Sequence, residues 1–189
     1  MSDILPIHYA LSEAAIMAAG GYAIVKAWPV NRWFATGLAA MTVAALIGTI
    51  RIALGLTGYT ITLHEFFSRY GALFGLGCIV GTMLTRGQIL PPLLGLGAAS
   101  LVLLVPAFAT PLFGVLILGG AVLAYRAALN RRFLAAGSFA FLICSALFSA
   151  PLRTNFPSFG WHVFHMLAAV WFVLVATFVP LKRGAPGNL

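Results

Sequence analysis

The sequence predicts an all-α, polytopic integral membrane protein with seven transmembrane helices in one bundle. Of its 189 residues, 62% are hydrophobic and only 7% are charged, whereas soluble domains carry roughly 25% charged residues. The mean hydropathy is +1.05. The apolar residues form long runs that lack the strict two-residue alternation of a membrane β-barrel. A chain so poor in charge cannot cover a soluble surface, and we therefore expect a single transmembrane domain over residues 1–189.

Each expected helix is an apolar run of about the length that a membrane-spanning helix needs, roughly 20 residues. The runs are separated by "WPVNR", "LTGYT", "TRGQ", "FATP", "LNRR" and "PLRTNFPS", which hold the Pro, Gly, Asn or Arg residues that end or turn helices. Gly-rich stretches such as "GALFGLGCIVG" favour close helix contacts in lipid. In chain order, the predicted helices cover about residues 7–27, 33–56, 61–84, 88–108, 111–129, 132–150 and 159–181.

The basic residues predict how this bundle is oriented. The second and fourth connections between runs carry no charge, and the sixth carries only Arg153. By the positive-inside rule the odd connections are cytoplasmic, which places the N-terminus outside and the C-terminus in the cytoplasm, as in a bacterial inner membrane. The start, "MSDILPIH", has no basic region, so we expect no cleavable signal peptide. The residues that set the orientation are Lys26, Arg32, Arg86, Arg126, Arg131, Arg132, Lys182 and Arg183.

The remaining composition limits the partners. The net charge is +8, but the basic residues punctuate the apolar runs and form no patch, so we expect no nucleic acid as a partner. The expected partners are the lipid bilayer and a lipid or small-molecule ligand. Cys78 and Cys144 both lie within apolar runs, which is typical of small buried side chains without a disulfide. No feature of the sequence sets an oligomeric state.

Unusual polar residues gather at the predicted outer ends of four runs. Ionisable groups within a membrane are costly, so they usually pair, line a cavity or carry function. Arg51 lies near the end of the second run. The first, third and last runs begin with the other members of the set, namely His8, Ser12, Glu13, His64, Glu65, His162 and His165.

The histidines predict a metal site. Positions three apart share a helix face, which places His162 beside His165, and His64 from the third run is a candidate third ligand. Three neutral imidazoles with an open position suit Zn²⁺ as a Lewis acid and activator of water. In this hypothesis Glu13 or Glu65 is the catalytic general base. Arg51, His8 and Ser12 are the predicted ligand-binding residues.

Other interpretations of the same residues stay open. His64 with His162 or His165 could ligate a single haem or pigment. A non-enzymatic transporter, sensor or subunit could instead bind a small ligand or protons among these side chains. The charges also have structural interpretations: Glu65 and Arg69 are spaced to pair on one helix. We predict that Arg51 has an acidic partner, Glu13 in preference to Glu65, because a lone arginine in hydrocarbon is costly.

The stretches "ALSEAAIM", "ALIGTIRIALG" and "WHVFHM" resemble the CREST superfamily of membrane hydrolases, which includes the alkaline ceramidases and the adiponectin-receptor and hemolysin III proteins. The resemblance implies a seven-helix bundle, a Zn²⁺ held by three histidines and hydrolysis of lipid amides such as ceramides. The sequence departs from this pattern at two places. His162 and His165 are spaced by three rather than four, and Arg51 stands where the family has a histidine, preceded by Ile47 in place of a serine.

Overall fold

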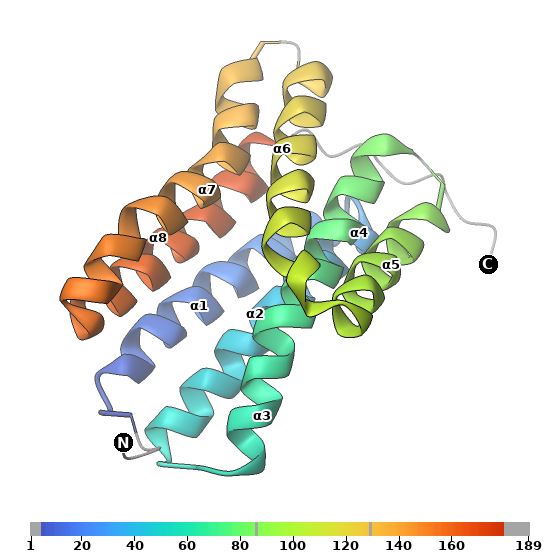
Figure 1. The fold of residues 1–189 in the computed structure, drawn as a ribbon. Coiled ribbons are helices and arrows are strands. Elements are labelled where there is room, and N and C mark those ends of the chain that lie inside the picture. Colours follow the sequence, from blue (N-terminus) through green and yellow to red (C-terminus); the bar gives the residue numbers. More distant parts are fainter. Residues whose placement is uncertain (1–4, 86, 129, 180–189) are drawn as a thin grey trace.

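Every predicted apolar run is helical in the computed structural model, which describes residues 5–85, 87–128 and 130–179 (Figure 1). No β-strand occurs in these ranges. The longest helix contains a π-helical segment, η1 (Phe67–Gly71), and a short 3₁₀ turn, η2 (Pro106–Phe108), precedes α6. The α-helices are α1 (Tyr9–Ala27), α2 (Arg32–Ala53), α3 (Tyr59–Phe66), α4 (Ala72–Leu84), α5 (Leu90–Leu104), α6 (Ala109–Ala127), α7 (Arg132–Asn155) and α8 (Pro157–Phe178).

Five helices of the described chain are long and apolar enough to cross a membrane. They are α2, the continuous helix α3–η1–α4, η2 with α6, α7 and α8. The remaining two are marginal for different reasons. α1 has 19 residues but includes Glu13 and Lys26, and α5 has 15 residues, fewer than the roughly 20 of a full span. The length and apolar composition of these five helices indicate a helical membrane protein.

Six of the helical rods close into a ring. α1 packs on α2, α2 on α4, α4 on α6, α6 on α7, α7 on α8, and α8 returns to α1. α5 lies outside this ring against α4 (Figure 1). Glycines permit that close approach, since a Cβ added at Gly77 of α4 would lie 2.7 Å from the Cα of Gly95 of α5. Large side chains such as Phe34, Phe139 and Trp171 are buried between these helices.

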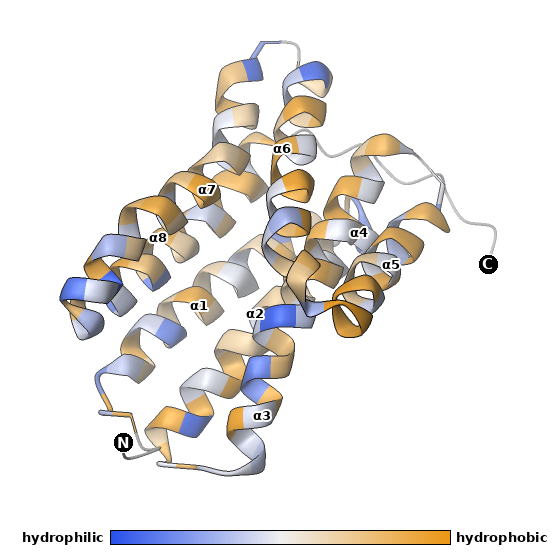
Figure 2. Ribbon diagram, viewed as in Figure 1, coloured by the Kyte–Doolittle hydropathy of each residue, from blue (hydrophilic) through white to orange (hydrophobic). Residues whose placement is uncertain are grey.

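Polar residues are concentrated at the two ends of the bundle, while the helices between them are mostly apolar (Figure 2). At one end, here called the Glu13 end, lie the starts of α1, α3 and α8 and the end of α2. The opposite end, called the basic end, holds Lys26, Arg32, Arg126 and Arg132. Arg86, Lys182 and Arg183, which also contributed to the predicted orientation, lie outside the described residues.

Two local features differ from the prediction. α7 continues to Asn155 through Pro151, five residues beyond the predicted end. In its last turn, Thr154 Oγ1 donates to the carbonyl oxygen of Ala150 and Asn155 Nδ2 donates to that of Pro151, and the N–H of Phe156 donates to the carbonyl oxygen of Leu152. As a result Arg153 stands on the helix and lines the interior cavity described below rather than lying in a loop.

The second difference is the π-helical segment η1. It begins two residues after Glu65 and includes Arg69. The ion pair for which these two side chains are spaced is absent from the described residues, where every ion pair involves Glu13. A four-residue spacing puts two side chains on one face but does not by itself bring their charged groups together.

Candidate functional site

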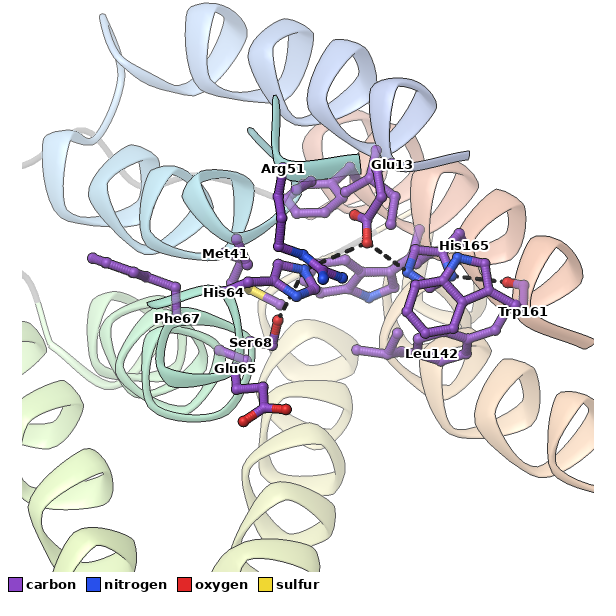
Figure 3. A pocket seen from close by; sticks show the side chains of 18 of the residues that line it. Glu13, Met41, Arg51, His64, Glu65, Phe67, Ser68, Leu142, Trp161 and His165 are labelled. Atoms are coloured by element: carbon purple, nitrogen blue, oxygen red, sulfur yellow. Dashed lines mark hydrogen bonds and ion pairs between the residues drawn. The ribbon is translucent and has the colours of Figure 1, made fainter. Parts of the chain in front are cut away.

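Glu13 of α1 is the centre of a polar cluster at its end of the bundle. Its Oε1 lies 3.3 Å from Nε2 of His165 on α8 and 3.4 Å from Nε2 of His64 on α3 (Figure 3). The residue is only 2% exposed. These contacts are ion-pair distances without well-directed hydrogen bonds, since Oε1 has no hydrogen-bond partner. Three helices far apart in the sequence thus meet at one carboxylate oxygen.

Gly48 of α2 makes room for this arrangement. A Cβ added there would lie 2.9 Å from Glu13 Oε1 and 2.9 Å from His64 Nε2, closer than side-chain atoms normally approach. Any larger residue would displace the carboxylate or the imidazole. Gly48 was not among the predicted site residues. The only feature of the sequence that could have identified it is its position in the stretch "ALIGTIR", one helical turn before Arg51.

The hydrogen bonding of His165 constrains the protons of the cluster. His165 Nδ1 lies 2.8 Å from the carbonyl oxygen of Trp161, which can only accept, so Nδ1 carries a hydrogen. In the neutral ring Nε2 is then the acceptor nitrogen, and it faces Glu13 Oε1, another acceptor, at 3.3 Å. A proton on Glu13 or on His165 would make this contact favourable, whereas no contact restricts the tautomer of His64 in this way.

His162 belongs to a different cluster. Its Nδ1 lies 3.1 Å from Ser12 Oγ, and its ring centroid is 5.2 Å from that of His8 and 5.1 Å from that of Tyr9. The Ser12 hydroxyl donates to the carbonyl oxygen of Tyr9, so it accepts from His162. The predicted ligand-binding residues His8 and Ser12 thus surround His162, one layer further toward the end of the bundle than Glu13.

The three imidazoles predicted to hold zinc are therefore not assembled. In an α-helix a three-residue spacing leaves two side chains about 60° apart around the axis. His165 turns toward Glu13 with its ring stacked on Trp161 at 4.4 Å, while His162 turns toward Ser12. The described residues contain no group of three or more side chains arranged to hold a metal ion. The donor set does not fit the zinc site that the resemblance implies.

Two other arrangements can be tested against the same contacts. A bis-histidine haem needs two free Nε2 atoms, but those of His64 and His165 both contact Glu13 Oε1. A Ser–His–Glu triad needs the serine and the carboxylate on different ring nitrogens. Ser68 Oγ lies 3.5 Å from His64 Nε2, the same nitrogen that faces Glu13. Neither arrangement matches the observed geometry.

A cavity of about 520 Å³ adjoins the cluster inside the ring of helices. Its volume falls in the range typical of small-molecule sites, about 300–1,000 Å³. Glu13, His64 and His165 line one part of it, and most of the remaining wall is apolar. The predicted catalytic residue Glu65 also lines the cavity, but its carboxylate points away from Glu13 (Figure 3). The carboxylates of the two predicted general bases, Glu13 and Glu65, therefore face different regions and do not form one site.

Arg51 lines the cavity too, and it is buried, at 6% exposed. The expected ion pair with Glu13 is absent: no carboxylate of the described chain lies within ion-pair distance of Arg51. Its Nε is buried without a hydrogen-bond partner. The physical reason is that the two imidazoles, rather than the guanidinium, occupy the positions next to Glu13 Oε1.

Comparison of the chain with known protein families, curated proteins and solved structures finds no match. The resemblance to the CREST superfamily consequently rests on the three short stretches alone. The function has to be inferred from the site itself.

Proposed function

We propose that this protein is a non-enzymatic, seven-span membrane protein that takes up and releases a proton at Glu13 and His165, as a proton-coupled transporter or a sensor does. One observation carries the proposal: a buried carboxylate contacts two imidazoles, and the hydrogen bond of His165 Nδ1 to Trp161 leaves the acceptor nitrogen of the neutral ring facing Glu13 Oε1. Histidine is the side chain that titrates nearest to physiological pH. Ionisable groups inside membranes commonly form such proton sites.

The packing supports seven spans. α1 lies between α2 and α8 and closes the ring, and α5 packs along α4. Both marginal helices are therefore held against helices that are long and apolar enough to cross the bilayer. The basic end carries Lys26, Arg126 and Arg132, so the positive-inside rule puts that end in the cytoplasm and the Glu13 end outside. The proton would then enter from the outer side.

Proton uptake would change the net charge of the residues beside the cavity. Arg51 already places a positive charge beside the cavity. With Glu13 ionised and both imidazoles neutral, the buried charges of Glu13 and Arg51 sum to zero. Each added proton leaves an excess positive charge in a low-dielectric region, which is costly unless water, an anion or a changed helix arrangement compensates it. Proton uptake is thereby coupled to the state of the cavity.

Difference infrared spectroscopy tests the proposal directly. For the protein in lipid nanodiscs, a change from about pH 8 to about pH 5 spans the titration range of histidine. We expect a protonated-carboxyl band that disappears in Glu13→Gln and shifts in His165→Gln. Glu65→Gln is the matched control, because its carboxylate points away from the cluster, and it should retain the band. Identical difference spectra for the parent and Glu13→Gln would contradict the proposal.

Metal analysis separates this function from the zinc-dependent hydrolysis that the CREST resemblance implies. The described residues do not assemble the predicted ligands His64, His162 and His165. We therefore expect purified protein to carry zinc well below one equivalent by mass spectrometry. Stoichiometric zinc that is lost in both His64→Ala and His165→Ala would overturn the proton proposal in favour of a hydrolase.

A further inference from the structure

The starting observation is the unpaired guanidinium of Arg51. It is more than nine-tenths buried, it lines the cavity, and its Nε has no partner. Glu13 contacts the histidines rather than Arg51. A buried charge without a partner is strongly unfavourable, and guanidinium groups bind carboxylate and phosphate groups in a bidentate manner. The cavity therefore offers a position for an anion next to Arg51.

The cavity is polar toward one end and apolar toward the other. Arg51, His64 and His165 line it near the Glu13 end. Met41 lines it from the same helix as Arg51, ten residues earlier, which corresponds to about 15 Å along α2. Phe172 of α8 lies similarly beyond His165, two turns deeper into the bundle. An occupant that matches this wall has an acidic head and an apolar tail.

The helix packing indicates where such a molecule enters. α6 packs against α4 but has no comparable packing with α3, which continues the same long helix toward the Glu13 end. Phe67 and Ser68 on one side and Phe113 on the other line the cavity at this interval. The helix ring is therefore packed less closely there than between α4 and α6. This interval is the position at which we expect a molecule from the membrane to enter.

We infer that the cavity binds a single-chain amphiphile from the bilayer whose acidic head group is held by Arg51. Other charged groups that line the cavity are Glu13, Glu65 and Arg153. Arg153 is exposed, with its guanidinium 5.1 Å from the ring centroid of Phe164, so it adds a second positive charge to the cavity wall. The inference does not depend on proton exchange at Glu13, because it rests on Arg51 and on the shape of the wall.

Tryptophan fluorescence provides the binding measurement, because Trp161 and Trp171 both line the cavity. The probe is terminally brominated dodecanoate, titrated into protein in phosphatidylcholine nanodiscs at fixed pH. Bromine quenches nearby tryptophan, so occupation of the cavity gives saturable quenching above the linear effect of partitioning. Unbrominated dodecanoate, dodecyl phosphate, dodecanol and dodecylammonium are then used as competitors. We expect only the two acids to compete.

Variants identify the role of each part of the cavity. Arg51→Gln should weaken binding about tenfold or more, as expected for loss of a charged hydrogen bond. Arg69→Gln, which removes a guanidinium that does not line this cavity, is the matched control and should bind as the parent does. Ala44 lines the apolar part of the cavity. Ala44→Phe should fill this part and abolish saturable quenching. This variant keeps the test decisive if Arg51→Gln does not fold.

The outcomes are distinguishable. Equal competition by dodecanol, or unchanged affinity in Arg51→Gln, would overturn the inference. Replacing phosphatidylcholine by phosphatidylglycerol identifies the source: competition by this two-chain lipid would overturn the single-chain assignment in favour of a phospholipid head group, and no competition supports a free single-chain acid. A parent that binds the probe but lacks the infrared band of Glu13 would retain the ligand site and lose only the proton function.

Discussion

Gly48 is as important to the site as the charged residues, because the space that it leaves is the space in which Glu13 and His64 meet. An added methyl group would lie 2.9 Å from an atom of each. The two histidines of "WHVFH" are likewise separated by local geometry. Because they are three residues apart on α8, His162 contacts Ser12 while His165 contacts Glu13. At this scale, the contacts of single atoms determine which of the polar residues act together.

Gly48→Ala should therefore lower stability even though alanine favours helices. We expect a loss of about 1–3 kcal/mol from crowding against Glu13 and His64. Gly21→Ala is the matched control, because nothing lies within 4 Å of a Cβ at that position of α1. It should be neutral or stabilising by up to about 1 kcal/mol. Thermal unfolding in detergent measures both, and equal effects of the two variants would contradict the crowding argument.

At the scale of helices, the ring of six and the peripheral α5 have different roles. The six ring helices enclose the cavity, with lining residues from α1, α2, the long helix α3–η1–α4, α6, α7 and α8. α5 contributes none of the lining residues. It is held through glycine contacts on α4, at Gly77 and at Gly81. Mutations that displace α5 should therefore lower stability without changing the site, whereas mutations in the ring helices should change both.

Gly77→Leu tests this division. Its side chain would collide with the backbone of Gly95 and push α5 away from α4, which we expect to cost about 1–3 kcal/mol or more. The infrared band of Glu13 should persist in the folded fraction, because α5 does not line the site. Gly97→Leu serves as the control, since its position on α5 is open. Loss of the Glu13 band together with an intact fold would show that α5 supports the site.

At the scale of the whole molecule, the two polar ends differ in kind. The Glu13 end combines acids, histidines and arginines around a cavity, whereas the basic end carries lysine and arginine without a carboxylate among the described residues. This asymmetry is the basis of the proposed orientation.

Cysteine labelling tests the orientation. In a background with Cys78→Ala and Cys144→Ala, a membrane-impermeant maleimide added from outside should react with Thr57→Cys and not with Asn130→Cys. Both positions are exposed, in connections at opposite ends of the bundle. Permeabilised cells provide the control, in which both should react. Labelling of Asn130→Cys alone in intact cells would invert the topology and place the proton site on the cytoplasmic side.

The amino-acid sequence alone determined the helical class, the approximate limits of all seven runs and the end of the bundle at which the polar residues gather. Apolar run length and the residues that interrupt it are local properties, and a membrane-spanning chain must satisfy its backbone hydrogen bonds within each helix. That is why Glu13, Arg51, His64 and His165 could be assigned to one region before any contact was known.

Only the tertiary structure decided the pairing within that region. It placed Glu13 between two histidines rather than beside Arg51, turned His162 away to Ser12, and left Glu65 and Arg69 without an ion pair. It also revealed Gly48 and the continuation of α7 through Pro151. Each of these depends on the rotation of one helix against another or on a change of helical phase, and rotations of this kind are set by side-chain packing between distant segments.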